Sequence, residues 1–532
     1  MKPIRLIRGF LTVGVWTLAS RILGFVRDIL FAAYLGAGPA AEAFVVAFSL
    51  PNMFRRFFAE GAFNMAFIPL FSKKLEGEED AKDFAESALA LLATILIVLT
   101  VLANLFMPAL VLAMASGFAG DERFDLAVDY GRVTFPYVLF ISLAALFSGV
   151  LNATGRFAAA AAAPVLLNVI LATAMIWAAR TGADVGRALT WGVPLAGIAQ
   201  LALVWIAAAR AGFALRLRLP RLSPEMKRLA IIAAPAALAG GVVQVNLLVG
   251  RQVASFFEGS IQYLNLADRL YQLPLGVVAI AIGVVLLPDL SRRLKAEDET
   301  GSRNAFNRAT EFALFLTVPS AVALVVIPET MISALFQRGR FTQDDAHATA
   351  LAVAIYGLGL PAFVLQKVLQ PLFYAREDTK SPFRYAVVAM VINAVLAIGL
   401  AFTFGYLAAA IATTAAGWVM MVLLWRGSRR MGAAVTFDDR MKRRVWRIVL
   451  ASLLMGWTHG VSAQVGDAAA GKEMIAVCSA CHGADGNSAA ATFPKLAGLG
   501  EKYLLKQLMD IRDGARPIPT MVGQLDGKSD QD

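Results

Sequence analysis

Long apolar runs recur along most of this 532-residue chain and restrict what it can fold into. A run of about 20 apolar residues can cross the roughly 30 Å hydrocarbon core of a membrane as a helix. Lipid offers no partners to backbone polar groups, so a spanning segment must be a helix or part of a closed barrel, and runs this long favour helices. We expect about thirteen spans, at residues 9–35, 41–71 (one bent crossing), 88–113, 130–153, 157–179, 189–209, 229–257, 266–290, 309–336, 348–374, 385–404, 406–425 and 445–460.

The charged residues indicate how these spans are oriented. The chain is 58% hydrophobic and only 16% charged, which excludes an ordinary soluble protein. Its net charge of +11 is concentrated in alternate loops, as cytoplasmic loops require, and so does not point to nucleic acid. Basic residues lie at the N-terminus and at 73–74, 156, 216–228, 292–295, 376–384 and 426–444; the intervening loops are neutral or mixed. This pattern places the N-terminus in the cytoplasm and the residues after 460 outside.

Two parts of the chain resemble each other at a nearly constant spacing. The segment at 69–75 recurs at 288–294, and Pro136 and Asn168 recur as Pro361 and Asn393. An even number of spans separates the pairs, which predicts an all-α polytopic membrane protein with two six-helix lobes in parallel orientation. In transporters such a repeat places the substrate path between the lobes. The alternative is chance similarity between two stretches rich in Leu, Ala and Val.

Charged side chains occur inside the first apolar run. Arg21, Arg27 and Asp28 lie there, and Arg21 and Asp28 are two helical turns apart on one face. A charge at the bilayer centre costs about 2.5–3.5 kcal/mol on insertion scales, so it normally faces a cavity or a partner. The alternative is that these side chains extend to the membrane interface, which applies more to Arg27 and Asp28 than to Arg21.

Further charges lie in the second and eighth runs. One cluster lies between Pro51 and Gly61 and comprises Asn52, Arg55, Arg56 and Glu60; the other is the pair Asp268 and Arg269. A salt bridge between Arg56 and Glu60 at a kink is the alternative for that pair. Arginine binds phosphate through two parallel hydrogen bonds, so these arginines predict an anionic, phosphorylated substrate. The chain has no Walker loop, and nucleotide hydrolysis is not expected.

The motifs that carry these charges resemble those of the MviN/MurJ lipid II flippases. The matching segments are 20–28, 50–63, 267–270 and 287–291, and the resemblance covers roughly residues 5–456. It implies two six-helix lobes in a V-shaped alternating-access bundle, in the multidrug/oligosaccharidyl-lipid/polysaccharide exporter superfamily. It also implies that the chain flips undecaprenyl-diphosphate disaccharide pentapeptide to the periplasmic leaflet of the bacterial inner membrane for peptidoglycan synthesis. This is transport rather than enzymatic catalysis, and no cofactor is implied.

The resemblance also assigns roles to individual residues. Arg21, Arg27, Arg55 and Arg269 would bind the diphosphate, and Asp28, Asn52 and Glu60 would be gating or partner groups. Glu42 stands where other members carry Asp. Expected partners are lipid II, membrane lipids and cell-wall synthesis proteins. A multidrug exporter of the same superfamily is an alternative, but the arginines would repel cationic drugs. Members have two spans after the twelfth, whereas only one apolar run remains here.

A second motif lies near the C-terminus. Both cysteines of the chain, Cys478 and Cys481, are followed by His482 in the order Cys-x-x-Cys-His. This is the attachment signature of c-type haem, in which two thiols bind the haem covalently and the histidine ligates iron. A thioredoxin-like pair would need a βαβ setting, and a zinc site would need two more ligands nearby. The motif therefore predicts covalent haem c.

The surrounding segment is similar to small class I cytochromes c of the c4/c553 type. That resemblance implies Met521 as the second axial ligand, with Met509 a weaker choice, and the segment lacks the C-terminal helix of the class. We therefore expect four regions: two lobes at 1–219 and 220–432, a thirteenth span or signal-peptide-like segment at 433–464, and a truncated cytochrome c-like fragment at 465–532 in the periplasm. Cleavage after Ala463 would release that fragment. A membrane-anchored periplasmic electron carrier is thus an alternative function.

Overall fold

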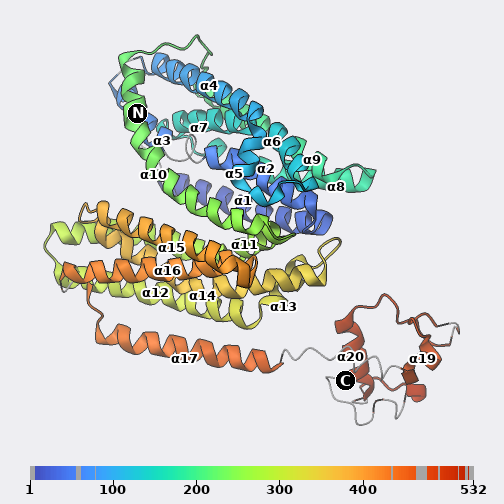
Figure 1. Ribbon diagram of the computed structural model, residues 1–532. Helices are drawn as coiled ribbons and strands as arrows, with labels where there is room; N and C mark the ends of the chain where they lie inside the picture. Colours follow the sequence, from blue (N-terminus) through green and yellow to red (C-terminus); the bar gives the residue numbers. More distant parts are fainter. Residues whose placement is uncertain are drawn as a thin grey trace. The chain divides into compact units, whose positions relative to one another are not determined.

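The computed structural model describes residues 6–55, 62–77, 80–432, 435–462, 476–488, 490, 492–512, 515–521 and 525. It separates into two compact units, residues 1–453 and 454–532. The described part contains helices and no strands, which confirms the prediction of an all-α protein (Figure 1).

The described residues in the first half of the larger unit form a series of α-helices. They are α1 (Leu6–Leu35), α2 (Pro39–Arg55), α3 (Ala62–Glu76), α4 (Ala81–Leu105), α5 (Met107–Met114), α6 (Glu122–Thr134), α7 (Tyr137–Ala153), α8 (Ala158–Thr181) and α9 (Val185–Arg210), with a 3₁₀ turn η2 (Ser116–Phe118). Short polar side chains cap the N-termini of several helices: Asp80 and Asp184 accept backbone N–H groups in the first turns of α4 and α9.

The second half repeats this order of elements. Its helices are α10 (Pro224–Ser255), α11 (Ser260–Lys295), α12 (Glu299–Val326), α13 (Pro328–Phe336), α14 (Gln343–Tyr374), α15 (Lys380–Phe404) and α16 (Leu407–Ser428), followed by the 3₁₀ turn η3 (Arg429–Met431). In each half a long helix is followed by a short one that has proline in its first turn, α4 by α5 and α12 by α13. Asn168 lies in α8 and its repeat partner Asn393 in the corresponding helix α15.

Eight helical segments among the described residues are long and apolar enough to cross a membrane. They are Ala81–Leu105, Glu122–Ala153, Ala158–Thr181, Val185–Arg210, Glu299–Val326, Gln343–Tyr374, Lys380–Phe404 and Leu407–Met431. Helices α1, α10 and α11 are 30, 32 and 36 residues long, which exceeds the length that a span needs. The count of thirteen spans remains a prediction.

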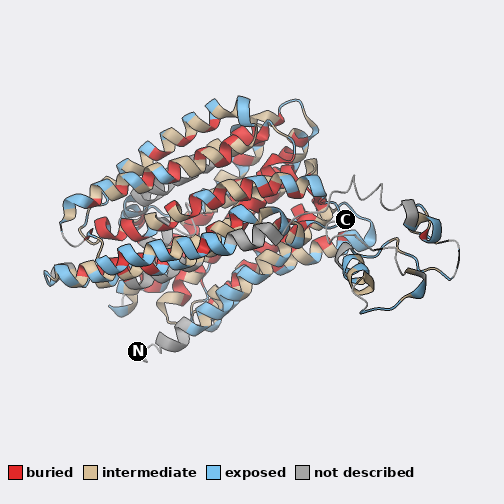
Figure 2. Cartoon of the chain, turned by 90° about the horizontal axis from the view of Figure 1, so that it is seen from below, coloured by how far each residue is buried: buried red, intermediate tan, exposed pale blue. Residues whose placement is uncertain are grey.

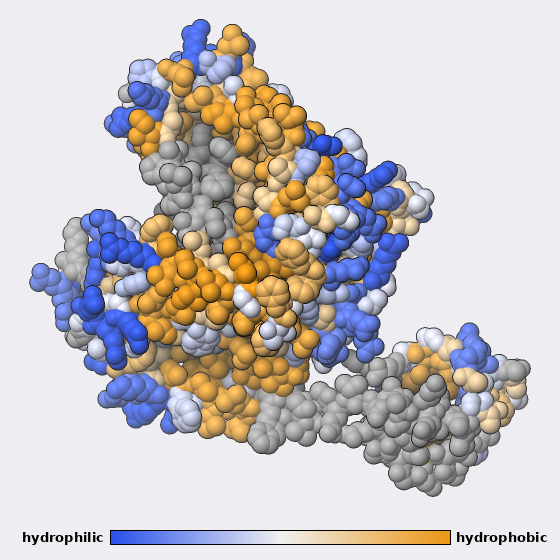
Figure 3. Space-filling view, in the orientation of Figure 1, coloured by the Kyte–Doolittle hydropathy of each residue, from blue (hydrophilic) through white to orange (hydrophobic). Residues whose placement is uncertain are grey.

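Burial and hydropathy fit a protein that lies in lipid. Buried residues concentrate on the faces that the helices turn toward one another (Figure 2). Many large apolar side chains are exposed instead, and wide apolar areas cover the surface of the larger unit, with hydrophilic residues gathered near its margins (Figure 3). Exposed apolar area of this extent is unusual for a soluble monomer and typical of a surface that contacts lipid.

The two halves use equivalent carboxylates to hold the segment that leaves each lobe. Glu86 on α4 is fully buried; it accepts the backbone N–H of Arg216 at 3.1 Å and pairs with the Arg218 guanidinium at 2.5 Å. Its counterpart on α12 is Glu311, which pairs with Arg444 at 3.2 Å. The spacing from Glu86 to Glu311 equals that from Pro136 to Pro361, so the structure extends the internal repeat to buried acids.

The residues that Glu311 holds lie in the first turns of α17 (Asp439–Ser462). This helix covers the expected thirteenth span but is not among the eight apolar segments. The physical reason is that basic residues such as Arg444 and Arg447 occupy its first turns and polar residues such as Thr458, His459 and Ser462 its last turns, which lowers its mean hydropathy. The cleavage position expected after Ala463 lies outside the described residues.

The smaller unit contains short elements. They are α19 (Ala476–His482), α20 (Glu501–Arg512) and the 3₁₀ turn η5 (Pro519–Met521). The Cys-x-x-Cys-His motif forms the last five residues of α19, and Met521 ends η5.

Candidate functional site

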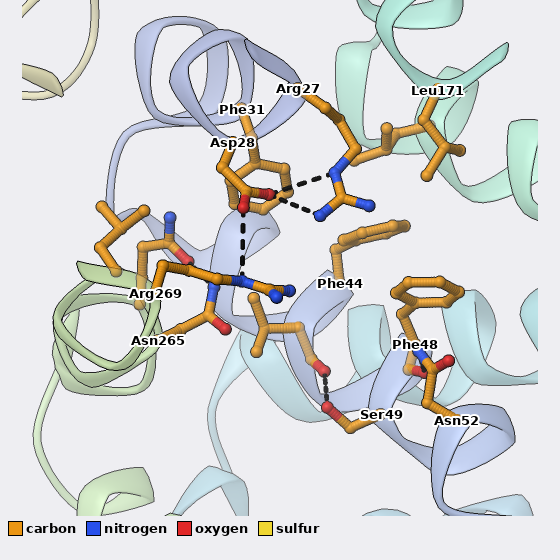
Figure 4. A pocket seen from close by; sticks show the side chains of 14 residues that line it. Arg27, Asp28, Phe31, Phe44, Phe48, Ser49, Asn52, Leu171, Asn265 and Arg269 are labelled. Atoms are coloured by element: carbon orange, nitrogen blue, oxygen red, sulfur yellow. Dashed lines mark hydrogen bonds and ion pairs between the residues drawn. The ribbon is translucent and has the colours of Figure 1, made fainter. Parts of the chain in front are cut away.

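A small polar cavity lies where α1, α2 and α11 meet, and it is the best candidate for a substrate site in the larger unit. Its volume is about 110 Å³, and Arg27, Asp28, Asn52 and Arg269 line it, together with Phe31, Phe44, Phe48, Asn265 and other side chains (Figure 4). The first half contributes α1 and α2, and the second half contributes α11. The structure thus brings four of the expected site residues together between the predicted lobes.

Asp28 is the centre of this cavity. Its Oδ1 accepts hydrogen bonds from Arg27 Nη2 at 2.6 Å and Nε at 3.1 Å, and its Oδ2 pairs with Arg269 Nε at 3.3 Å (Figure 4). The side chains of Arg27 and Asp28 are 14% and 11% exposed, whereas that of Arg269 is 46% exposed. One carboxylate therefore holds two guanidiniums, and the cavity carries a net positive charge with Arg269 the more accessible cation.

Asn168 on α8 also holds the Arg27 guanidinium. Its Oδ1 accepts from Arg27 Nη1 at 3.0 Å, and its Nδ2 donates to the backbone carbonyl of Ser20 at 2.9 Å. The side chain also packs 3.6 Å from the position of a Cβ on Gly24. Asn168 was expected only as a marker of the repeat. The sequence feature that could have identified Asn168 as a site residue is its amide within an apolar run, because a buried amide needs hydrogen-bond partners.

The other expected residues lie elsewhere or are not described. Arg21 is exposed and does not line the cavity; its guanidinium lies 2.9 Å from the position of a Cβ on Gly276 of α11. Arg55 is half-buried at the end of α2, three residues beyond Asn52, and is also not part of the lining. Glu60 lies outside the described residues.

A buried carboxylate near the cavity joins the two halves of the unit. Glu42 on α2 is fully buried; it accepts the backbone N–H of Ile261 in the first turn of α11 at 2.9 Å and pairs with Arg123 Nη1 at 2.9 Å. Arg123 also lies over the ring of Phe118, 4.6 Å from its centroid. The family resemblance had drawn attention to Glu42, whereas Arg123 was not expected to be a site residue. The sequence feature that could have identified Arg123 is that it is a lone arginine among the acids of an outer loop.

Asp121 completes this group. It accepts from Arg123 Nε at 2.6 Å and from the backbone N–H of Arg123 at 3.0 Å. Desolvation tends to raise the pKa of this carboxyl, but the Arg123 N–H and guanidinium outweigh it and hold the pKa below its ordinary value of 3.8. Arg123 is therefore held by carboxylates on two sides.

Two further contacts join the halves through neighbouring loops. The Gln252 side chain accepts from the backbone N–H of Ser116 at 2.7 Å, and the backbone N–H of Arg340 donates to the carbonyl of Ala33 at 2.8 Å. The second contact needs a close backbone approach, since a Cβ on Gly339 would lie 2.2 Å from that carbonyl oxygen. All these contacts involve loops or helix ends that the charge pattern places outside.

The smaller unit offers a separate candidate site around His482. This side chain is buried, and its Nδ1 lies 2.8 Å from the carbonyl oxygen of Pro494. A carbonyl can only accept, so Nδ1 carries the proton and Nε2 is left as the lone-pair nitrogen for a metal. Cys478 and Cys481 are exposed free thiols on the same short helix. The residues therefore fit the expected covalent haem.

Comparison with known proteins assigns most of the chain to one family. Residues 31–467 match the family of the lipid II flippase MurJ, and residues 468–530 match the cytochrome c family. A probable lipid II flippase MurJ of Rhizobium tropici is 47% identical over 458 residues, which is 85% of this chain and 86% of the relative. The lipid II flippase MurJ of Burkholderia cenocepacia is 32% identical over 86% of this chain and 90% of its own length.

Solved structures agree with the sequence relatives. A lipid II flippase MurJ in an inward closed conformation superposes with a TM-score of 0.74 at 26% identity, over 86% of this chain and 94% of that one. A multidrug transporter of the MATE family in an inward-facing conformation gives a TM-score of 0.65 at 14% identity, over 79% of this chain and 96% of that one, and shares the fold. From the family match and these relatives, the chain belongs to the MurJ family of lipid II flippases.

Proposed function

We propose that this chain flips lipid II, the undecaprenyl-diphosphate-linked peptidoglycan precursor, from the cytoplasmic to the periplasmic leaflet of the bacterial inner membrane. The observation that carries the proposal is the Arg27–Asp28–Arg269 group, in which cations from both halves meet in one cavity. Membership of a flippase family supports transport rather than enzymatic catalysis. The net positive charge of the cavity suits a diphosphate and would repel a cationic drug.

The diphosphate would compete with Asp28 for the two arginines. Arg269 is the first candidate to bind it, because its guanidinium is the more exposed and contacts Asp28 at the longer distance of 3.3 Å. Arg27 is held by both Asp28 and Asn168 and would stay in place as a preformed donor. A phosphate can accept two parallel hydrogen bonds from the Arg269 guanidinium, whereas Asp28 contacts it through Nε at the long distance of 3.3 Å, so exchange of partners at Arg269 is favourable.

The cavity must open before a lipid II head group can enter. At about 110 Å³ it is well below the roughly 300–1,000 Å³ of ordinary ligand pockets, and a disaccharide pentapeptide is larger still. The contacts of Glu42 with Ile261 and of Ala33 with Arg340 join the halves at loops predicted to face the periplasm. This closure supports entry from the cytoplasmic side, followed by separation of the halves on the periplasmic side.

The test is rescue of peptidoglycan synthesis in flippase-depleted cells by the full chain. We expect the full chain to rescue, and Arg27→Ala and Arg269→Ala to lose rescue or lower the rate of lipid II flipping. Arg338→Ala is the matched control, because Arg338 is an exposed loop arginine whose guanidinium donates to the nearby carbonyl of Ala334. If both cavity variants flip lipid II at the wild-type rate, the arginines do not bind the diphosphate. If the full chain fails to rescue, the proposed flippase function is wrong.

We also propose that the smaller unit binds covalent haem c in the periplasm. The supporting observation is the contact between His482 Nδ1 and the Pro494 carbonyl, which orients Nε2 for iron. Cys478 and Cys481 would hold the haem through thioether bonds, and Met521 would be the second protein ligand of the iron. The group would provide electron transfer when bound.

Haem absorbance that survives denaturation tests this second proposal. We expect it in the full chain and expect its loss when Cys478 and Cys481 are both changed to serine. Flipping should be unaffected by that double change, since the cysteines lie outside the larger unit. The absence of haem from a chain whose C-terminal unit is exported would count against the assignment.

A further inference from the structure

We propose that the groove between α8 and α9 binds an anionic phospholipid, with its phosphate at Arg187 and an acyl chain between Trp177 and Trp191. The groove has a volume of about 850 Å³ and is lined by Ile170, Ala174, Trp177, Arg187, Trp191 and Leu195 together with small neighbours. This inference does not depend on the proposed flipping activity.

The body of the groove suits a hydrocarbon chain. The two tryptophans are 58% and 66% exposed and line the groove from different helices, Trp177 on α8 and Trp191 on α9. Small residues bring the helices together at its floor: a Cβ on Gly192 would lie 3.1 Å from Leu171 and 3.5 Å from Ala174. Both helices qualify as membrane spans, so the lining lies at a depth where lipid chains are the surrounding medium.

One end of the groove is polar and carries an available cation. Asp184 is engaged as the N-cap of α9, where its Oδ1 accepts the backbone N–H of Arg187 at 2.7 Å. The Arg187 side chain is exposed, and within the described residues no hydrogen bond or salt bridge holds its guanidinium. Arg180 lies in the last turn of α8 and does not line the groove. The Arg187 guanidinium at this end of the groove therefore favours a phosphate.

The length of the groove indicates an acyl chain from one leaflet. From Arg187 to Leu195 helix α9 rises about 12 Å, at 1.5 Å per residue. Half of the hydrocarbon core is about 15 Å deep, so a chain that begins at Arg187 reaches approximately the middle of the bilayer. Tryptophan and arginine also mark the interface where phospholipid head groups lie.

The groove is separate from the central cavity. Leu171 of α8 and Leu189 of α9 line the cavity, whereas Ile170, Ala174 and Trp191 line the groove. At about 100° per residue these two sets lie on different faces of each helix. An occupant of the groove therefore contacts the outer surface of the protein, which favours a resident phospholipid over the head group in transit.

The experiment uses the full chain in lipid nanodiscs and measures quenching of tryptophan fluorescence by brominated acyl chains. Brominated phosphatidylglycerol and brominated phosphatidylcholine are compared at equal mole fraction. The contribution of Trp191 is obtained by subtracting the signal of Trp191→Phe in each background. We expect the anionic lipid to quench Trp191 with about fivefold higher apparent affinity, since one basic residue at the surface has about that effect.

Two arginine variants test whether Arg187 causes the preference for the anionic lipid. Arg187→Gln should abolish it, and Arg180→Gln, an exposed arginine in the same turn that does not line the groove, should retain it. Both positions are exposed, so the variants are expected to keep the thermal stability of the parent. Equal quenching by the two lipids, or a preference that survives Arg187→Gln, overturns the proposal.

Discussion

At the scale of single residues, the site depends on one carboxylate shared by two arginines. Asp28 holds Arg27 through two hydrogen bonds and Arg269 through a salt bridge across the halves. The arrangement places the anion where it competes with a substrate phosphate for the same guanidiniums. Asp28 is therefore both a structural tie and the group that the substrate must displace.

Neutralising Asp28 should slow lipid II flipping at least about tenfold. Asp28→Asn removes charge-assisted hydrogen bonds worth about 1.5–3 kcal/mol, and both arginines lose their anchor. The measurement is the flipping rate at matched expression. Asp80→Asn is a control in which an exposed capping carboxylate is neutralised away from the cavity. A rate equal to that of the parent would remove Asp28 from the mechanism.

Asn168→Ala should lower stability by about 1–3 kcal/mol, because it leaves the Ser20 carbonyl and Arg27 without an amide partner. The readout is the thermal midpoint of the purified protein in detergent. Asn104→Ala is the matched control, since the Asn104 amide donates to the carbonyl of Thr100 in its own helix. Equal losses in both variants would show that the contact with Arg27 contributes nothing.

Sequence motifs predicted part of this site and missed another part. Arg27, Asp28 and Arg269 were expected, because charges within apolar runs need partners. Arg21 was expected to join them, since it shares a helix face with Asp28, but the cavity spans fewer helical turns than that face. The Glu42–Arg123 pair depends on a contact between distant segments, which no local pattern records.

At the scale of elements, the apolar runs predicted where long helices lie but did not predict where those helices break. The run at 88–113 is divided into α4 and α5, and the run at 309–336 into α12 and α13. Pro108 and Pro328 lie in the first turn of each short helix, where proline is tolerated. Hydropathy is insensitive to such breaks, because both sides of the break are apolar.

Glu311→Gln should release the first turns of α17. Glu311 is 7% exposed and pairs with Arg308 and Arg444, so loss of its charge leaves the arginines without their common partner. We expect trypsin to cleave within residues 440–447 several times faster than in the parent. Glu329→Gln, an exposed carboxylate paired with His347, should leave cleavage unchanged. Unchanged cleavage in Glu311→Gln would exclude this carboxylate as the anchor.

The same segment should loosen in acid through Asp438. Desolvation tends to raise the pKa of this carboxyl, but the Met441 N–H and the Arg308 guanidinium outweigh it and hold the pKa below 3.8. A lowered pKa stabilises the docked form above the ordinary value, and the effect is lost as pH falls through the lowered value. Pepsin cleavage near 435–447 should therefore rise below about pH 4, and Asp438→Asn should remove that dependence.

At the scale of the whole molecule, successive parts of the chain match two different families. The MurJ match ends at residue 467 and the cytochrome c match begins at 468, whereas the compact units divide at 453 and 454. From the sequence we expected a boundary between residues 464 and 465. The contacts that close one side of the larger unit could not be predicted, because they join residues from opposite halves of that unit, as in Glu42 and Ile261.

Loss of the Glu42 carboxylate should open that closed side. In a background with Cys478→Ser and Cys481→Ser, an A33C/R340C pair should form a disulfide, since the Ala33 carbonyl accepts the Arg340 N–H at 2.8 Å. Adding Glu42→Ala should reduce the yield of cross-linked protein severalfold, because Ile261 and Arg123 lose their shared partner. Equal yields with and without Glu42 would show that other contacts maintain the closure.

Because the paired acids are equally spaced, each half of the molecule can serve as the reference for the other half. Glu86, Pro136 and Asn168 all lie at one spacing from their counterparts in the second half, so no net insertion separates the lobes between these markers. A substitution can therefore be made twice in one polypeptide, in the same chemical setting, expression level and membrane. Any difference between Glu86→Gln and Glu311→Gln then measures how differently the two halves depend on their buried acid.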